Sequence, residues 1–481
     1  MRNAESSAGC RAACRMVLLL FALTLTGCAT YSDSFGVIKH NLAKQEYDAA
    51  LTEIEKQAES QKSRVLYLLN KGMVLRMKRD FSGSNDMLKA AKSEMERLYA
   101  ESVSENALSF IVNDATVSYA GEDYEQVLVH LYMALNYLEL GQLGDARVEA
   151  LQVDLKLREI NEDIPDNKFS EDALSRYITG MIYEELGEWS DAMIAYRKSY
   201  EAFQNYQDNY ALAVPDMLKH DLLKLGTRLG LNDEVAQYRE EFGIESEVKP
   251  LVSEREGELV FILNNGLAPI KREKIIAASG PSPTIAVHAS NRKKAKTTAT
   301  VKAVAPVLVN IALPYYESRP NNVRRAHVSV ANANVASVDE TTPSVHTQLM
   351  EDIDAIAKAS LDARMAAITA RSIARAVSKV AIQNSVDRAG QHSDIDPAAE
   401  LIGSLFVRVA AIATERADTR SWLTLPANVQ LARMALKPGS YDIRVDMLGS
   451  NDRIVETIIY KDVVINKKQK TYLTHHWIPN E

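Results

Sequence analysis

The chain has 481 residues, of which 46% are hydrophobic and 25% charged, and its net charge is -8. This composition excludes a disordered or collagen-like chain, and the length allows two or three globular domains. Nucleic acid is not an expected ligand because no basic helix with interleaved aromatic residues occurs.

The first residues have the pattern of an export signal. Arg11 and Arg15 precede an apolar run at 16–25, which is too short to span a membrane. The run closes on Leu-Thr-Gly-Cys28, the pattern that the lipoprotein signal peptidase cleaves. We therefore predict a cleaved signal peptide at 1–27 and a lipidated tether at 28–40, with acyl chains such as palmitate on Cys28. The alternative is an ordinary secretory signal with a chance cysteine.

The residues after Cys28 are Ala29 and Thr30, so the second mature position lacks the Asp that retains enteric lipoproteins in the inner membrane. We expect a periplasm-facing lipoprotein of the outer membrane. Cys10 and Cys14 lie in the segment that would be removed, so the mature chain would keep no thiol for a disulfide.

Helical spacing of apolar residues continues from position 31 to 245, interrupted by a recurring glycine. The clearest unit has Gly180 for close helix contact, Tyr183 to pack over it, Gly187 to end the helix, and Ala192 at the next crossing. A second copy runs from 134 to 146. In two weaker copies, Tyr47 and Phe81 lie 34 positions apart, which is the tetratricopeptide period, although later steps are about 62 and 46 residues.

Residues 41–247 thus resemble the tetratricopeptide superfamily. The resemblance implies a solenoid of helix pairs with a concave face for a peptide or helix. Tyr67, Tyr124, Tyr132 and Tyr206 are candidates for lining that face; alternatively they are half-buried packing residues.

Residues 251–481 combine short β-branched runs with Ala-rich helices at about 348–413. We expect strands at 258–263, at 307–313 where Pro314 would stop the strand, and in a final antiparallel module from 441 to 477. The predicted fold class is α + (α+β): an N-terminal α-helical tetratricopeptide-like solenoid, then a mixed α+β region ending in a small antiparallel β-sandwich-like module.

The two halves differ in charge. Residues 29–250 hold about 24 basic and 40 acidic side chains, whereas 251–481 hold about 29 and 23. The difference has two interpretations: solvated surfaces of unrelated domains, or a basic rear half that meets lipid headgroups or glycan phosphate. The basic stretch 291–296 is either a solvated loop or a contact with anionic lipid.

No motif for catalysis, metal or cofactor binding is present. The chain lacks G-x-S-x-G, H-E-x-x-H and the phosphate-binding loop. His475 and His476 are adjacent, so in a strand they would point to opposite faces. We expect no enzyme activity, no cofactor and no metal.

The segment 417–426 contains Trp422 and Arg420 between a helix and a strand. Both residue types dominate binding hot spots, so the segment is a candidate partner site. Alternatively, it is a junction in which Trp422 fills the core and Asp418 pairs with Arg420.

This segment, the helix at 371–376 and the strand ending at 311–314 are similar to an uncharacterised family of proteobacterial tetratricopeptide lipoproteins. Its members are often encoded near lipoproteins that resemble activators of penicillin-binding proteins. The resemblance implies a non-enzymatic scaffold for periplasmic proteins, possible partners being the cell-wall synthesis machinery. The alternatives are a component of a polysaccharide or protein export complex and a glycan-remodelling enzyme.

Overall fold

The computed structural model describes residues 35–58, 60–104, 117–163, 171–210, 212–244, 255–280, 284–290, 296–302, 307–331, 343–390 and 416–480. The predicted signal peptide, Cys28, the basic residues 291–295 and the second Ala-rich helix lie outside the described residues. None of the described helices is long and apolar enough to cross a membrane.

The described helices between 36 and 242 form five consecutive pairs. They are α2 (Gly36–Ala43) with α3 (Tyr47–Glu55), α4 (Arg64–Met77) with α5 (Phe81–Ser104), α6 (Asp123–Glu139) with α7 (Leu143–Asp163), α8 (Ala173–Leu186) with α9 (Trp189–Tyr210), and α10 (Asp216–Arg228) with α11 (Asn232–Phe242). Each of α4 to α10 contacts the next helix along the chain. The first helix begins at Gly36, five positions before the predicted start of the repeats.

Each pair turns at one residue with positive φ. These residues are Gln45, Arg79, Gly141, Gly187 and Gly230. Gly187 ends α8 in the left-handed conformation at φ 76°, as the sequence predicted. The turn geometry is therefore the same in all five pairs, although only three of them have glycine.

The strands form two four-stranded sheets and two hairpins. The inner sheet has the order β12 (Lys470–Trp477), β1 (Gly257–Asn265), β9 (Asn428–Leu436) and β8 (Gln348–Asp352). The outer sheet has the order β11 (Ile454–Ile465), β10 (Gly439–Leu448), β6 (Arg325–Ala331) and β7 (Ser344–His346). The sequence predicted this order, with the helices first and the strands after them.

The pairing of the last strands corrects the prediction of a single antiparallel module. β10 and β11 are antiparallel neighbours in the outer sheet, but β12 joins the inner sheet and runs parallel to β1. Tyr472 and Leu473 are both buried, although they point to opposite faces of β12. A strand covered on both faces belongs in a central layer.

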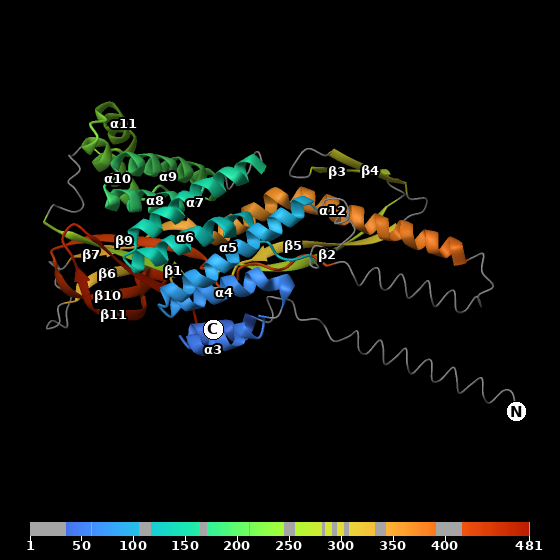
Figure 1. The fold of residues 1–481 in the computed structure, drawn as a ribbon, viewed down its shortest axis with the longest axis horizontal. Helices are drawn as coiled ribbons and strands as arrows, with labels where there is room; N and C mark the ends of the chain where they lie inside the picture. Colours follow the sequence, from blue (N-terminus) through green and yellow to red (C-terminus); the bar gives the residue numbers. More distant parts are fainter. Residues whose placement is uncertain are drawn as a thin grey trace.

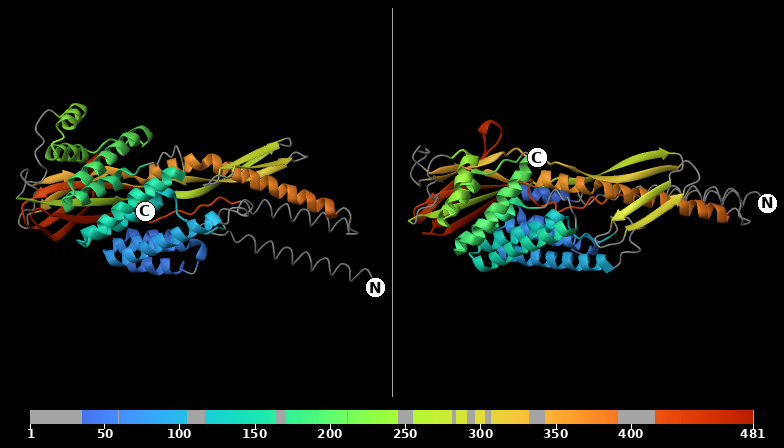
Figure 2. Two further views of the ribbon diagram at one scale, coloured as in Figure 1. Left: turned by 45° about the horizontal axis from the view of Figure 1, so that its top comes forward. Right: turned by 90° about the horizontal axis from the view of Figure 1, so that it is seen from above.

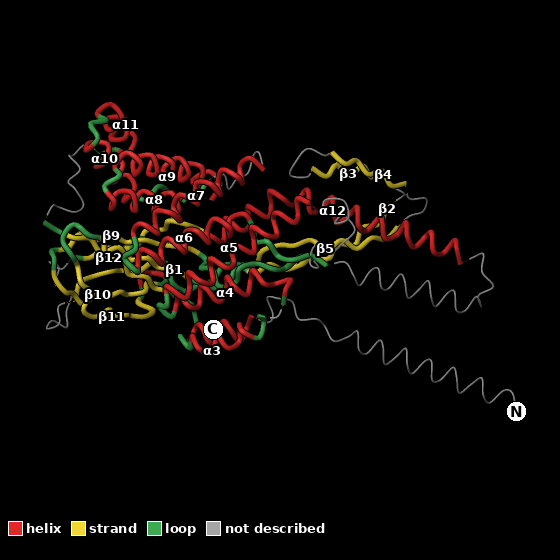
Figure 3. Tube along the Cα trace, in the orientation of Figure 1, coloured by secondary structure: helices red, strands yellow, loops and turns green. Residues whose placement is uncertain are grey.

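The helices, the inner sheet and the outer sheet form three layers (Figures 2 and 3). Val260 and Ile262 of β1 share a core with the helices, whereas Leu259, Phe261 and Leu263 share a core with the outer sheet. This alternation places the inner sheet between two apolar surfaces. The two halves of the sequence therefore meet along one face of the inner sheet.

An arm extends from these layers (Figure 1). It contains the ribbon of β2 (Ile270–Gly280) with β5 (Val307–Glu317), the hairpin of β3 (Thr284–Ser290) with β4 (Lys296–Lys302), and α12 (Ile353–Gly390). Residues 348–352 form β8 rather than the start of the Ala-rich helix. β5 continues through Pro314, because a strand with one described partner can turn the missing N–H outward.

Candidate functional site

The side of the helical pairs that faces the inner sheet is called the inner side. There, residues 417–425 of the same chain contact the helices. Trp422 at its centre is 1% exposed, and its ring meets the ring of Tyr132 in α6 edge to face at 6.1 Å. The indole N–H donates to the Thr424 hydroxyl at 2.9 Å. The segment is thus anchored by a fully buried aromatic side chain.

Side chains of the helices accept hydrogen bonds from the backbone of this segment. The Trp422 N–H donates to Glu125 Oε1 of α6 at 2.8 Å, and the Thr424 N–H donates to Asn70 Oδ1 of α4 at 3.2 Å. The Thr424 hydroxyl also donates to Asn70 at 2.9 Å. The helices therefore hold this segment partly through its backbone, at a turn formed by residues 423 and 424.

Arg420 lies beside this anchor and is 7% exposed. It pairs with Asp418 at 2.8 Å, donates to the Lys62 carbonyl at 2.9 Å and lies over the Tyr119 ring at 5.3 Å. Its charge is therefore neutralised within the chain.

Of the other predicted site residues, Tyr132 joins Trp422 and Arg420, and Tyr206 lies apart from them. Tyr132 is fully buried, and its hydroxyl donates to Asn264 of β1 at 2.9 Å. Tyr206 of α9 is 1% exposed and donates to Glu351 of β8 at 3.2 Å. All four predicted partner-binding residues thus contact this chain itself, and in this structure none belongs to an exposed binding surface.

Glu125 is an acid that the sequence interpretation missed. Its second oxygen accepts from the Tyr119 hydroxyl at 2.6 Å and from the Glu122 N–H at 3.1 Å. Burial, followed by the nearby charge of Glu122, raises the pKa of Glu125 to about 7. Glu122 itself pairs with Lys271 of β2 and Arg364 of α12, and these cations hold its pKa low against the effect of burial.

A second missed cluster joins the helices to the inner sheet at Arg433 of β9. Its guanidinium donates to Glu258 at 2.6 Å, to the Tyr177 hydroxyl at 2.7 Å, and to Asp221. The Arg433 side chain is 1% exposed, and its partners come from β1, α8 and α10. No local sequence signal brings these residues together, because they are separated by up to 256 positions.

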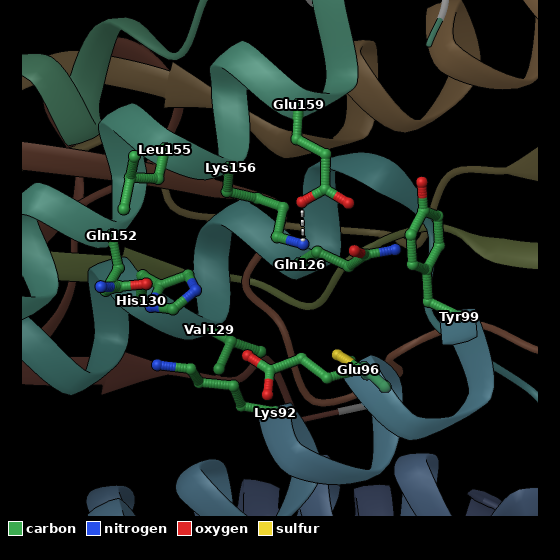
Figure 4. A pocket seen from close by; sticks show the side chains of 11 residues that line it. Lys92, Glu96, Tyr99, Gln126, Val129, His130, Gln152, Leu155, Lys156 and Glu159 are labelled. Atoms are coloured by element: carbon green, nitrogen blue, oxygen red, sulfur yellow. Dashed lines mark hydrogen bonds and ion pairs between the residues drawn. The ribbon is translucent and has the colours of Figure 1, made fainter. Parts of the chain in front are cut away.

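The opposite side of the helices carries a cavity of about 180 Å³ between α5, α6 and α7 (Figure 4). Lys92, Glu96, Tyr99, Gln126, Val129, His130, Gln152, Leu155, Lys156 and Glu159 surround it, together with Met95. Lys156 and Glu159 pair along α7 at 2.7 Å. The lining therefore contains positively and negatively charged side chains together with apolar ones.

His130 at this cavity is held by a buried acid. Its Nδ1 lies 2.7 Å from Glu149 Oε2, and burial lowers the pKa of His130. A neutral ring oriented by a carboxylate resembles a catalytic pair, but no Ser, Thr or Cys lines the cavity. Among the described residues no group of three or more His, Cys, Asp or Glu side chains could hold a metal ion.

An apolar stripe on α7 runs beside this cavity. Val148 is 52% exposed, Leu151 41% and Leu155 52%, and Leu155 also lines the cavity. The spacing of three and four places all three side chains on one face of the helix. These residues form the α7 stripe, an exposed apolar surface of the kind that marks protein contacts.

No protein-family model and no curated protein matches the chain. Among solved structures, the apo form of RapI is 14% identical with a TM-score of 0.33, over 47% of this chain and 56% of RapI. MamA 41-end from Desulfovibrio magneticus RS-1 is 11% identical with a TM-score of 0.28, over 44% and 96%. Pseudomonas aeruginosa pilF is 12% identical with a TM-score of 0.29, over 45% and 78%.

Proposed function

We propose that this chain is a non-enzymatic scaffold that binds a protein partner through the outer side of its tetratricopeptide-like helices. The observation that supports the proposal is the α7 stripe beside an open cavity, on helices whose inner side is occupied at α4 and α6 by residues 417–425. The free surface for a partner is therefore the outer one.

The chemistry of this surface favours a helix or extended peptide with one apolar anchor. Val148, Leu151 and Leu155 offer the apolar contact, and charged side chains of both signs flank the cavity. An anchor side chain in a pocket with polar groups around it is the usual arrangement of a binding hot spot. The partner class that we propose first is the cell-wall synthesis machinery of the periplasm, followed by an export complex.

We also propose that Cys28 fixes the scaffold to the outer membrane by its acyl chains. The support is the Leu-Thr-Gly-Cys28 pattern after an apolar run. A Cys28→Ser change should leave the precursor unprocessed and keep the chain out of the outer-membrane fraction, as should globomycin in the unchanged protein. Unaltered processing and attachment in both experiments would overturn the anchor.

The partner surface is tested by Val148→Asp with Leu151→Asp in the full-length protein. Affinity capture from crosslinked cells should lose its most enriched partner in this variant. The control is Ile459→Asp in β11, where the side chain is 51% exposed on the outer sheet, and it should keep that partner. Equal recovery by the stripe variant and the control would contradict the proposal.

Surface substitutions are a sharper test than removal of the repeats. The inner sheet shares its core with the helices, so deletion of residues 29–250 would expose Val260, Ile262 and Leu431. A chain with that face exposed would lose partners through misfolding as well as through loss of the binding surface.

A further inference from the structure

The arm is long and narrow in every view (Figures 1 and 2). α12 has 38 residues, a length of about 57 Å for a straight helix. It contacts β5 and β3 along the arm, and Arg364 of α12 pairs with Glu122, the residue before α6. The arm is thus held at its base by an ion pair to a buried carboxylate.

The described elements of the arm are basic overall. Its four strands and α12 contain eleven Lys or Arg and five Asp or Glu. The whole chain nevertheless has a net charge of -8. Positive charge concentrated on one extension of an acidic protein attracts an anionic partner.

Apolar side chains are exposed among these cations. On one face of the ribbon, Ile276 is 40% exposed and Tyr315 44%, and they lie beside Arg272 and Lys274. Exposed isoleucine and tyrosine beside lysine and arginine suit the interface of an anionic bilayer, which takes up both charge and apolar surface. A soluble polyanion would contact the cations of the arm but would not bind its exposed apolar side chains.

The start of the described chain lies at the base of the arm. Arg319, two positions after the end of β5, lies over the Phe35 ring at 5.4 Å. Cys28 precedes Phe35 by seven residues, which an extended chain spans in at most about 25 Å. An acyl chain on Cys28 would therefore bring the base of the arm to the membrane surface.

We propose that the arm lies on an anionic lipid surface, with Lys274 and Arg272 at the headgroups and Ile276 and Tyr315 of the same ribbon face in the interface. Its position beside Cys28 rests on the proposed anchor, whereas the lipid contact itself rests on the charge and exposure of the arm. The contact orients the α7 stripe relative to the membrane.

The test uses the chain from residue 28 onward with Cys28→Ser, so that no acyl chain contributes. It should sediment with vesicles of equal parts phosphatidylcholine and phosphatidylglycerol, and not with phosphatidylcholine alone. Lys274→Glu with Ile276→Ser should weaken binding by at least about fivefold, since each cation near such a surface contributes about 1 kcal/mol.

The matched control is Lys467→Glu with Ile459→Ser, which changes an exposed cation and an exposed isoleucine of the outer sheet region. It should bind as tightly as the parent chain, and circular dichroism should show both variants folded. Equal binding by the arm variant and the control would overturn the proposal. Binding to dextran sulfate without binding to the vesicles would overturn it in favour of a polyanion. Neither result bears on the α7 stripe or on the processing of Cys28, which are measured separately.

Discussion

At the scale of single residues, charged and polar groups inside the molecule join its two halves. Arg433, Glu258, Asp221 and Tyr177 form one such cluster, and Glu122, Lys271 and Arg364 form another. A buried charge is costly unless it is paired and hydrogen bonded, so each member depends on the others.

Replacement of Arg433 by Met should lower the free energy of unfolding by about 3–5 kcal/mol, because Asp221 and Glu258 would be left buried without their cation. Urea titration measures the change. The control Arg325→Met removes an exposed pair with Asp452 and should cost less than about 1 kcal/mol. A similar small loss in both variants would show that the buried cluster contributes little.

Glu125 makes stability depend on pH. Its folded pKa of about 7 lies above the ordinary value of 4.5, so the folded state keeps a proton that the unfolded state has already lost. The contribution of Glu125 is complete below about pH 4.5 and is lost as the pH rises towards 7. The free energy of unfolding of Glu125→Gln, relative to that of the parent chain, should therefore increase as the pH rises from 5 to 8. A difference between the two proteins that stays constant over this range would contradict the raised pKa.

At the scale of elements, the helical pairs were the most predictable part. Gly180 was expected to allow close helix contact, and a Cβ on it would lie 2.4 Å from the Tyr196 ring in α9. Tyr196 is fully buried and its hydroxyl donates to Glu184 at 2.9 Å, so the ring has no room to move.

A Gly180→Ala change should therefore destabilise the protein by about 1–3 kcal/mol through overpacking. The control is Gly144→Ala in α7, where nothing lies within 4 Å of the added Cβ. That change should stabilise by up to about 1 kcal/mol, because alanine favours a helix more than glycine does. Thermal unfolding of the two variants gives the comparison, and equal shifts of the same sign would be inconsistent with the tight contact.

The strands were predictable one at a time, but their pairing was not. Alternation marks β10 in the sequence, yet nothing local shows that β12 lies beside β1, more than 200 positions away. Pro314 and residues 348–352 were misinterpreted for the same reason. Local propensity predicts a break or a helix there, and the partners β2 and β9 hold both segments as strands.

At the scale of the whole molecule, the change of pattern near residue 250 predicted two separate regions, and the structure joins them. Residues 417–425 occupy the inner side of α4 and α6, and their anchor Trp422 was a candidate binding residue in the sequence. An aromatic anchor looks the same in sequence whether it meets another protein or its own chain. The sequence did not predict the α7 stripe, because the exposure of its side chains depends on which face of α7 the neighbouring helices cover.

The central claim is that the helices and the sheets form one body around Trp422, and native-state hydrogen exchange tests it most directly. Trp422→Ala should cost about 3–5 kcal/mol and accelerate the slowest amides of α4, α6, β1 and β9 by the same factor. The control Ile459→Ala, at an exposed side chain, should leave these amides unchanged. Faster exchange in β1 and β9 with unchanged protection in α4 and α6 would show two independent domains and contradict the account.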